Sequence, residues 1–284
     1  MRRIAFVAAL VLAGCALRGP TAAQQRPDPP PYNILVSNDD GVRAPGIAAV
    51  AQVLQAIGNV IIVAPADNQS GKGHSIVTTE PVVREDLTLP NGMKAIGLTA
   101  TPASTVNIAI RNIVKPKPDL VVSGINRGYN LADSVYLSGT AGAAREGAIH
   151  GVPAIAASLD ARAAPRDFVA AAEEVLGVAR RVKQYGLPAN TFLNVNIPGV
   201  PAGGYRGYYV TTQERAKSGT ESFTEFKDSS GGTIYRNKFE EPTGGGPQGT
   251  DSWAVQQGYV SVTPMRVGED DPSQMETWRQ RFTQ

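Results

Sequence analysis

From residue 33 onward, short apolar runs alternate with segments of helical periodicity, and this alternation limits the fold more than any other feature of the chain. Strands separated by helices run in the same direction, because each helix returns the chain to the edge where the next strand begins. We therefore expect an α/β fold with a mostly parallel sheet and helices on both faces. The expected strands are 33–37, 60–64, 75–84, 93–98, 119–123, 153–158 and 191–197, and the expected helices are 45–57, 102–114, 139–150 and 167–185.

The residue pattern changes after Pro198. Aromatic residues, threonines and clusters of turn residues replace the alternation of strands and helices. We expect a β-hairpin-rich extension over 205–250 that lies outside the parallel sheet, has no helical crossover and helps to form a homodimer or tetramer. In the tail 266–284, Met275, Trp278 and Phe282 have helical spacing, which predicts a helix packed on its own or on a partner subunit. With 284 residues, 42% of them hydrophobic, the chain is long enough for one large α/β domain or two small ones. We expect one domain over 33–265.

The first residues have the features of an export signal. Arg2 and Arg3 precede an apolar run that is too short to span a bilayer. The run ends in Leu-Ala-Gly-Cys, which resembles the site where bacterial lipoproteins are cleaved and then lipidated at the cysteine, here Cys15. We expect a signal segment 1–23, a Pro-rich tether 24–32, and a periplasmic or exported protein, with a lipid anchor at Cys15 as one outcome. Two alternatives stay open, namely cleavage after Ala23 without lipidation and a cytoplasmic protein with a mis-assigned start codon.

The charge balance argues against one class of partner. The formal net charge is +2, and the sequence contains no basic run interleaved with aromatic residues. Proteins that bind nucleic-acid polymers carry such patches, because they must neutralise phosphates along the strand. We therefore expect no binding to nucleic-acid polymers.

Adjacent aspartates follow the first expected strand, in the segment Asn38-Asp39-Asp40-Gly41. Two neighbouring carboxylates repel each other, so a positive group is expected beside them. Hard oxygen ligands favour a divalent cation such as Mg²⁺ or Mn²⁺. The alternative is an ordinary turn, since Asn, Asp and Gly are common turn residues. Asn38 is expected to shape this turn.

Further loops that follow strands also carry oxygen-bearing side chains. Ser70 and Asn126 lie on two of them, and Ser138-Gly139-Thr140 leads into an expected helix. Because the carboxyl ends of parallel strands meet at one edge, we expect these groups to gather with the aspartates. The N–H groups and dipole at a helix N-terminus favour phosphate. A metal beside a phosphate site indicates phosphoryl-transfer chemistry.

Other well-known phosphate and metal motifs do not occur in the sequence. The segment 70–75 lacks the spacing of a Walker A loop. The chain has only two histidines, His74 and His150, which excludes a zinc site built on several histidines. His74 is either a general acid or a solvent-exposed loop residue, and His150 is expected at the end of a helix as a capping partner.

Several long motifs, in order and at compatible spacing, resemble the stationary-phase survival protein (SurE) family of 5′-nucleotidases. They cover most of the chain between residues 33 and 265. They are ILVSNDDGVRAPGI (34–47), VAPADNQSG (63–71), TPASTVNIAI (101–110), DLVVSGINRGYN (119–130), YLSGTAGAAREGAIHGVPAIAASL (136–159), NVNIP (194–198) and DSWAVQQGYVSVTPM (251–265).

The resemblance implies a Rossmann-like α/β core, a dimer with exchanged C-terminal segments, and one divalent metal ion, Mg²⁺ or Mn²⁺, per subunit. It implies metal ligation by Asp39, Asp40, Ser70 and Asn126, with the two aspartates also catalytic. The segment Ser138-Gly139-Thr140 matches the phosphate-binding segment of the family. Asn130 is expected to contact the substrate.

The activity implied by the resemblance is hydrolysis of nucleoside 5′-monophosphates, with 3′-monophosphates as a further substrate class. The attacking group is either a water molecule or Asp39 itself. One alternative is an exported broad-specificity phosphatase or exopolyphosphatase. An alternative of another class is a surface protein that binds nucleotide or metal without catalysis.

The chain departs from the family pattern at several positions. Ser37 stands where threonine is common, and the expected signal segment is atypical. Tyr129 stands where the family often has proline or another residue, which is expected to alter the wall of the substrate pocket.

Overall fold

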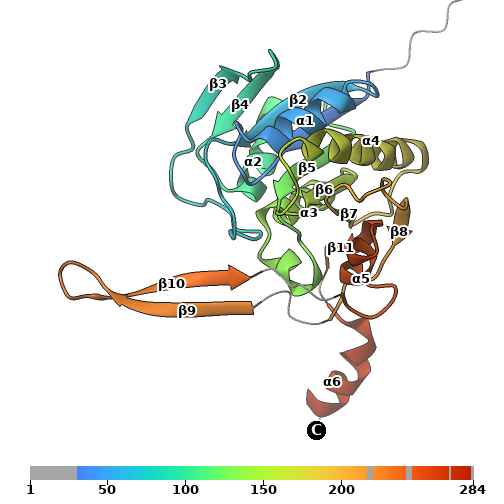
Figure 1. Ribbon diagram of the computed structural model, residues 1–284. Coiled ribbons are helices and arrows are strands. Elements are labelled where there is room, and N and C mark those ends of the chain that lie inside the picture. The colour runs from blue at the N-terminus through green and yellow to red at the C-terminus, as the bar shows by residue number, and fades with distance from the viewer. Residues whose placement is uncertain (1–30, 216–219, 241–244, 269, 283–284) are drawn as a thin grey trace, which may run out of the picture. The chain divides into compact units, whose positions relative to one another are not determined.

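A nine-stranded, mostly parallel sheet forms the centre of the fold in the computed structural model (Figure 1). The structure describes residues 31–215, 220–240, 245–268 and 270–282, so the expected signal segment 1–23 and most of the tether 24–32 lie outside the described residues. The strands of the sheet are β1 (Asn33–Ser37), β2 (Asn59–Pro65), β3 (Arg84–Thr88), β4 (Lys94–Leu98), β5 (Leu120–Arg127), β6 (Ala154–Leu159), β7 (Thr191–Ile197), β8 (Tyr208–Val210) and β11 (Val260–Arg266).

The strand order is β3-β4-β2-β1-β5-β6-β7-β11-β8. β1 pairs in parallel with both β2 and β5, and the same direction continues through β4 on one side and through β6 and β7 on the other. β3 and β11 run antiparallel to their neighbours β4 and β7. After β1 the chain moves outward on one side of the sheet and then returns to the other side at β5. The carboxyl ends of β1 and β5 therefore form a topological switch point, where α/β proteins bind ligands.

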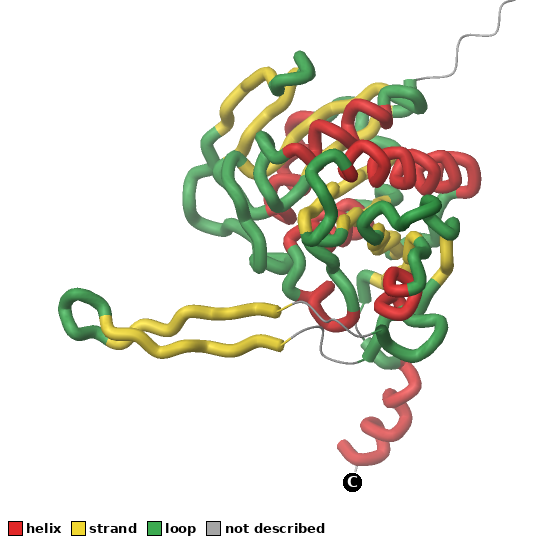
Figure 2. Tube along the Cα trace, viewed as in Figure 1, coloured by secondary structure: helices red, strands yellow, loops and turns green. Residues whose placement is uncertain are grey.

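Helices cover both faces of the sheet, as the red and yellow layers in Figure 2 show. The helices α1 (Pro45–Leu54) and α4 (Asp167–Tyr185) pack on one face, and α2 (Pro102–Ile108) and α3 (Gly139–Ile149) pack on the other. Side chains alternate between the faces along each strand. In β1, Ile34 and Val36 join the core under α1 and α4, whereas Leu35 joins the core under α2 and α3. These observations confirm the predicted α/β fold with helices on both faces.

The expected strand 75–84 is wrong, because β3 begins only at Arg84. Pro81 breaks the run before it, and a proline cannot donate a hydrogen bond to a ladder. β3 and β4 pair antiparallel, with Thr88 opposite Lys94 across the connection 89–93.

β5 is longer than predicted, because the expected strand 119–123 continues to Arg127. Its pairing with β6 shifts between Ser123 and Asn126, which is a β-bulge. Gly124 makes the bulge possible. Its φ is +136°, and a Cβ atom there would lie 2.4 Å from the Ala157 carbonyl oxygen. Residues 124–127, which follow the expected strand, thus belong to β5, and Ala132–Tyr136 forms a 3₁₀ turn between β5 and α3.

The C-terminal part is less separate from the sheet than expected. β9 (Thr220–Lys227) and β10 (Thr233–Glu240) do form a separate antiparallel hairpin. However, β8 and β11 belong to the main sheet, and the short helix α5 (Asp251–Gln256) directly precedes β11. The hairpin confirms the predicted β-hairpin-rich extension, and α5 begins only after the expected range 205–250. The expectation that all of this range lies outside the sheet is wrong, because β8 belongs to the main sheet. The predicted tail helix is α6 (Met275–Phe282). No helix in the described ranges is both long and apolar enough to cross a bilayer.

Candidate active site

Asp39 lies at the carboxyl end of β1 with only 3% of its surface exposed. The Thr140 hydroxyl donates a hydrogen bond to its Oδ1 over 2.6 Å. Burial raises the pKa of Asp39 above its ordinary value, although the Thr140 hydroxyl and the N–H groups of Gly139 and Thr140 act in the opposite direction. The N-terminus of α3 therefore offsets part of the cost of burying this carboxylate, but burial has the larger effect.

Gly139 allows α3 to approach this carboxylate closely. A Cβ atom on Gly139 would lie 2.8 Å from Asp39 Cβ and 3.0 Å from Asp39 Oδ2. Ser138 begins the helix, since its Oγ accepts a hydrogen bond from Ala141 N over 3.0 Å. Ser138 thus caps α3, while the Thr140 hydroxyl faces Asp39. Phosphate contact by Ser138, Gly139 and Thr140 stays a prediction.

Asp40 is held on the β5 side of the same edge. Its Oδ2 accepts a hydrogen bond from Arg127 N over 3.1 Å, directly after the bulge. Burial and the neighbouring charge of Asp39 raise the pKa of Asp40 to about 6. Two adjacent carboxylates are thus kept in positions that disfavour their negative charge, and a divalent cation beside them would offset that cost.

Ser70 and Asn126 reach this edge from the two strands that flank β1. The Gln69 N–H donates to the Asp39 carbonyl oxygen over 2.7 Å, which places the Ser70 loop beside the first aspartate. Asn126 immediately precedes Arg127, and its Nδ2 donates to the Gly128 carbonyl oxygen over 2.8 Å. That bond uses the Nδ2 group of the carboxamide. The structure therefore brings the four predicted metal ligands to one edge of the sheet.

The donor set fits a hard divalent cation. It offers two carboxylates, a hydroxyl and a carboxamide oxygen, which are ligands that Mg²⁺ and Mn²⁺ accept. Within the part of the chain that the structure describes, no three His, Cys, Asp or Glu side chains are grouped to hold a metal ion. A site at Asp39 and Asp40 would therefore draw its other ligands from neutral oxygens such as those of Ser70 and Asn126.

Asn130 is fixed in a buried polar network that the sequence analysis did not identify. Its Nδ2 donates to Ser158 Oγ over 2.8 Å, and its backbone N–H donates to Asn196 Oδ1 over 2.8 Å. Asn194 Nδ2 donates to its carbonyl oxygen over 2.8 Å. The available signal was NVNIP, in which asparagines occupy alternate positions of a buried strand. A role of Asn130 in substrate binding stays a prediction.

Glu146 is a second residue that the sequence analysis missed. It lies on α3 with 4% of its surface exposed, and its Oε2 lies 2.8 Å from His74 Nε2. Asn107 Nδ2 donates to Glu146 Oε1 over 2.6 Å, and His150 Nε2 lies 3.2 Å from the same oxygen. His74 is thus bound to α3 instead of being a free loop residue. A glutamate in a helix of small residues was the signal for this contact.

Two cavities adjoin the carboxyl edge. The smaller, of about 220 Å³, contains Asp40 and Arg127 in its wall. The larger, of about 530 Å³, lies between the loops after β5, β6 and β7 and the helix α5. Asp160 and Ala163 line both cavities, which are therefore neighbours.

Comparisons with known proteins agree with this architecture. The family model "Survival protein SurE" matches residues 34–220. The chain is 40% identical over 235 residues to "5′-nucleotidase SurE" of Geotalea daltonii, covering 82% of this chain and 92% of that protein. It is 42% identical over 235 residues to the protein of the same name from Syntrophotalea carbinolica, covering 82% of this chain and 91% of that protein. 

A solved structure is similar over nearly its whole length. The crystal structure of the SurE protein from Aquifex aeolicus superposes with a TM-score of 0.74 at 36% sequence identity, covering 87% of this chain and 98% of that one. Sequence, sheet topology and the grouping of the expected ligands thus lead to the same assignment, and the chain belongs to the SurE family.

Proposed function

We propose that the protein hydrolyses nucleoside 5′-monophosphates to nucleoside and phosphate with the help of one divalent metal ion. The observation that carries the proposal is the pair Asp39 and Asp40 at the switch point, with Ser70 and Asn126 beside them. The curated relatives that carry the name 5′-nucleotidase support the substrate class.

Asp39, Asp40, Ser70 and Asn126 would hold the metal ion. When bound there, a divalent cation supplies Lewis-acid stabilisation of the negative charge on the phosphate oxygens. Thr140 keeps Asp39 oriented through the hydrogen bond to Oδ1. The start of α3 lies beside Asp39, and its dipole would favour the negative charge of a phosphate bound there as well as that of Asp39.

We infer that water attacks the phosphorus. The oxygen of water forms the new P–O bond and the ester P–O bond breaks. One proton of the water goes to the nucleoside oxygen as it leaves, and the other stays with the phosphate. Asp39 is a poor nucleophile in this setting, because the Thr140 hydroxyl and the N–H groups of α3 already bind its carboxylate. The test is acid quenching during turnover of a substrate that is radiolabelled in its phosphate group. We expect no label on the protein, whereas label on Asp39 would show a covalent intermediate.

Phosphate release from nucleoside 5′- and 3′-monophosphates, with Mg²⁺, with Mn²⁺ and with chelator, tests the function. We expect release that needs a metal and that falls about a hundredfold or more in Asp39→Asn and Asp40→Asn. Asp86→Asn is the matched control. This exposed aspartate lies on the outermost strand β3, where it pairs with Arg84, and not at the carboxyl ends of β1 and β5. No release with any metal would instead favour a nucleotide- or metal-binding protein without catalysis.

We also propose export to the periplasm, with Cys15 as the lipid-anchor site. The Arg2-Arg3 start, the apolar run and the Leu-Ala-Gly-Cys segment support this proposal. In fractionated cells, the wild type should be in the membrane fraction and Cys15→Ser should be released from it. An exported enzyme would serve as a scavenger of phosphate, so short polyphosphates belong in the substrate panel.

A further inference from the structure

The larger cavity adjoins the smaller cavity that contains Asp40. The reaction proposed above uses none of the residues that line the larger cavity. Its volume is about 530 Å³, which is within the range of small-ligand sites. Asp160 and Ala163 belong to its wall and also to the wall of the smaller cavity that contains Asp40. The two cavities therefore meet at Asp160 and Ala163, and a ligand with its phosphate at Asp40 would have to pass these residues to enter the larger cavity.

One carboxylate fixes two flat side chains at the wall of this cavity. The Tyr129 hydroxyl donates to Asp160 Oδ2 over 3.2 Å. Arg162 Nη2 donates to the same oxygen over 2.9 Å, and Arg162 Nε donates to Asp160 Oδ1 over 2.9 Å. All three residues line the cavity. The tyrosine ring and the guanidinium group are therefore neighbours with restricted freedom.

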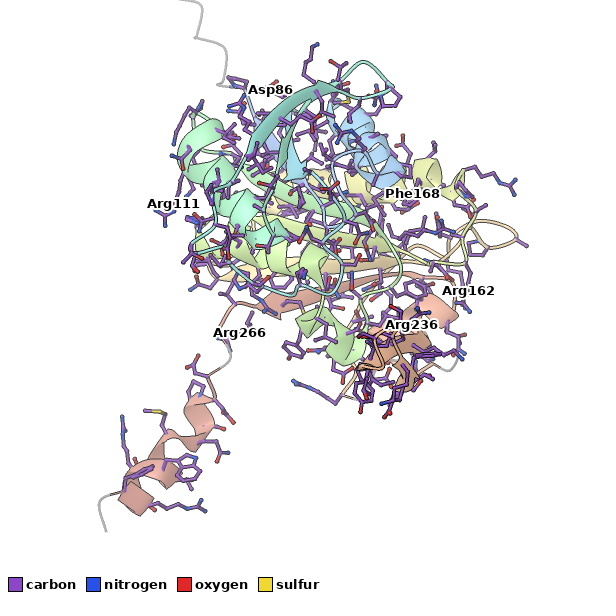
Figure 3. The ribbon with its side chains drawn as sticks, turned by 90° about the vertical axis from the view of Figure 1, so that its left-hand side faces the viewer. Asp86, Arg111, Arg162, Phe168, Arg236 and Arg266 are labelled. Carbon is purple, nitrogen blue, oxygen red and sulfur yellow. The ribbon has the colours of Figure 1, made fainter. Side chains whose placement is uncertain are left out.

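Asp160 is well suited to hold these groups as an anion. Only 8% of its surface is exposed. Burial raises the pKa of Asp160, but the hydrogen bonds from Arg162 and Tyr129 and the charge of Arg162 outweigh burial and keep the pKa below its ordinary value. Arg162 lines the larger cavity and Phe168 lines the smaller one, and both are labelled in Figure 3.

The chemistry of the wall matches a nucleoside. Nucleobases stack on aromatic rings and on guanidinium planes. Leu131, Val200 and Val255 add apolar surface, and Ser252 and Gln256 add hydrogen-bonding groups. A flat, partly polar ligand such as a base with its ribose can use both kinds of contact.

We propose that this cavity binds the nucleoside part of the substrate, with Tyr129 and Arg162 as the stacking surface and Asp160 as the positioning residue that holds them. The proposal rests on the proposed function for the identity of the substrate. It also assigns a role to Tyr129, at a position where the chain departs from the family pattern.

Calorimetric titration of the metal-free protein with adenosine, guanosine, cytidine and uridine tests binding without catalysis. For the tightest-binding nucleoside, Tyr129→Ala should weaken binding about tenfold, because it removes one stacking surface. Tyr129→Phe keeps the ring and should bind more tightly than Tyr129→Ala. Tyr185→Ala is the control, since Tyr185 is exposed on α4 and does not line the cavity. Equal affinity in wild type and Tyr129→Ala, or no nucleoside binding, would overturn the proposal.

Kinetics separates this proposal from the proposed function. The ratio of kcat/KM for the best nucleoside monophosphate to that for phenyl phosphate should fall about tenfold in Tyr129→Ala, mainly through KM. An unchanged ratio with both esters hydrolysed would refute the nucleoside site and leave the phosphatase function intact. If neither ester is hydrolysed, the phosphatase function fails, and the titration still decides whether the cavity binds nucleosides.

Discussion

Gly139 packs so closely against Asp39 that there is no room for a side chain at this position. A Cβ atom there would lie 2.8 Å from Asp39 Cβ, so an alanine must displace either Asp39 or the start of α3. We predict that Gly139→Ala lowers kcat about a hundredfold, because small displacements of a catalytic group have effects of that size. The measurement is phosphate release from a nucleoside monophosphate at saturating metal.

Gly147 provides a matched control for this prediction on the same helix. A Cβ atom at Gly147 would lie 2.9 Å from Val121 Cγ2, in the core and away from the aspartates. Gly147→Ala should therefore lower the free energy of unfolding by about 1–3 kcal/mol through overpacking, as we also expect for Gly139→Ala. The activity of each folded molecule should stay unchanged. If both variants keep activity, the close contact between α3 and Asp39 is not needed for catalysis.

At the scale of elements, α3 connects the aspartates to the loop that carries Ser70. Its first turn binds Asp39 through Thr140. Further along, a Cβ atom on Gly142 would lie 2.2 Å from the Gly73 carbonyl oxygen, so the loop packs directly on the helix. Glu146 then binds His74 at the end of that loop. The helix therefore holds the turn after β1, which carries Asp39, and the loop after β2, which carries Ser70, in fixed positions relative to each other.

We predict that Glu146→Gln loosens this loop and destabilises the protein by about 2 kcal/mol at neutral pH, because it removes charge-assisted hydrogen bonds of a buried group. Burial raises the pKa of Glu146, but His74, Asn107 and His150 outweigh it and lower the pKa below the ordinary value of 4.5. A lowered carboxyl pKa contributes stability that is present above 4.5 and is lost as the pH falls through the folded-state value.

The stability difference between wild type and Glu146→Gln should therefore shrink as denaturation is measured from about pH 7 to about pH 3. Glu173→Gln, at an exposed position on α4, is the control and should show little difference at any pH. A difference that stays constant on acidification would mean that the charge of Glu146 does not hold the loop.

The sequence predicted the elements well where one local pattern decides them. The apolar runs of β1, β2 and β7 and the helical periodicity of α4 identify those elements. A short apolar run indicates a strand buried on both faces, and apolar residues at helical spacing indicate a helix with one buried face. The bulge in β5 could not be predicted in this way. Gly124 ends the apolar run and resembles the start of a loop, and its close contact with Ala157 depends on a partner strand far along the chain.

The candidate site shows the same division. The positions of Asp39, Asp40, Ser70 and Asn126 after strands predicted that they gather at one edge, because parallel strands share that edge. The Thr140 hydroxyl bond to Asp39 and the Glu146 contact with His74 are side-chain contacts between elements separated in sequence. Neither local propensity nor spacing encodes them, so only the packed structure reveals them.

For the whole molecule, the hairpin β9–β10 presents apolar side chains on both of its faces. Phe226 is opposite Ile234 on one face, with 41% and 36% of their surfaces exposed. On the other face, Phe223 and Tyr235 are 62% and 64% exposed. A two-stranded ribbon is marginally stable by itself, and exposed apolar surface marks contact sites. We propose that a second copy of the chain covers the hairpin in a homodimer or tetramer.

This proposal predicts that the double variant Phe223→Ser with Phe226→Ser, which changes both faces, has a lower molar mass than the wild type in light scattering after size exclusion. The two serines remove apolar contact area from the interface without adding charge, so association weakens while the nine-stranded sheet keeps its own core. Tyr185→Ser is the control, since Tyr185 is 77% exposed on α4 and should leave the mass unchanged. A monomeric wild type, or a double variant with the mass of the wild-type oligomer, would show that the hairpin does not mediate assembly.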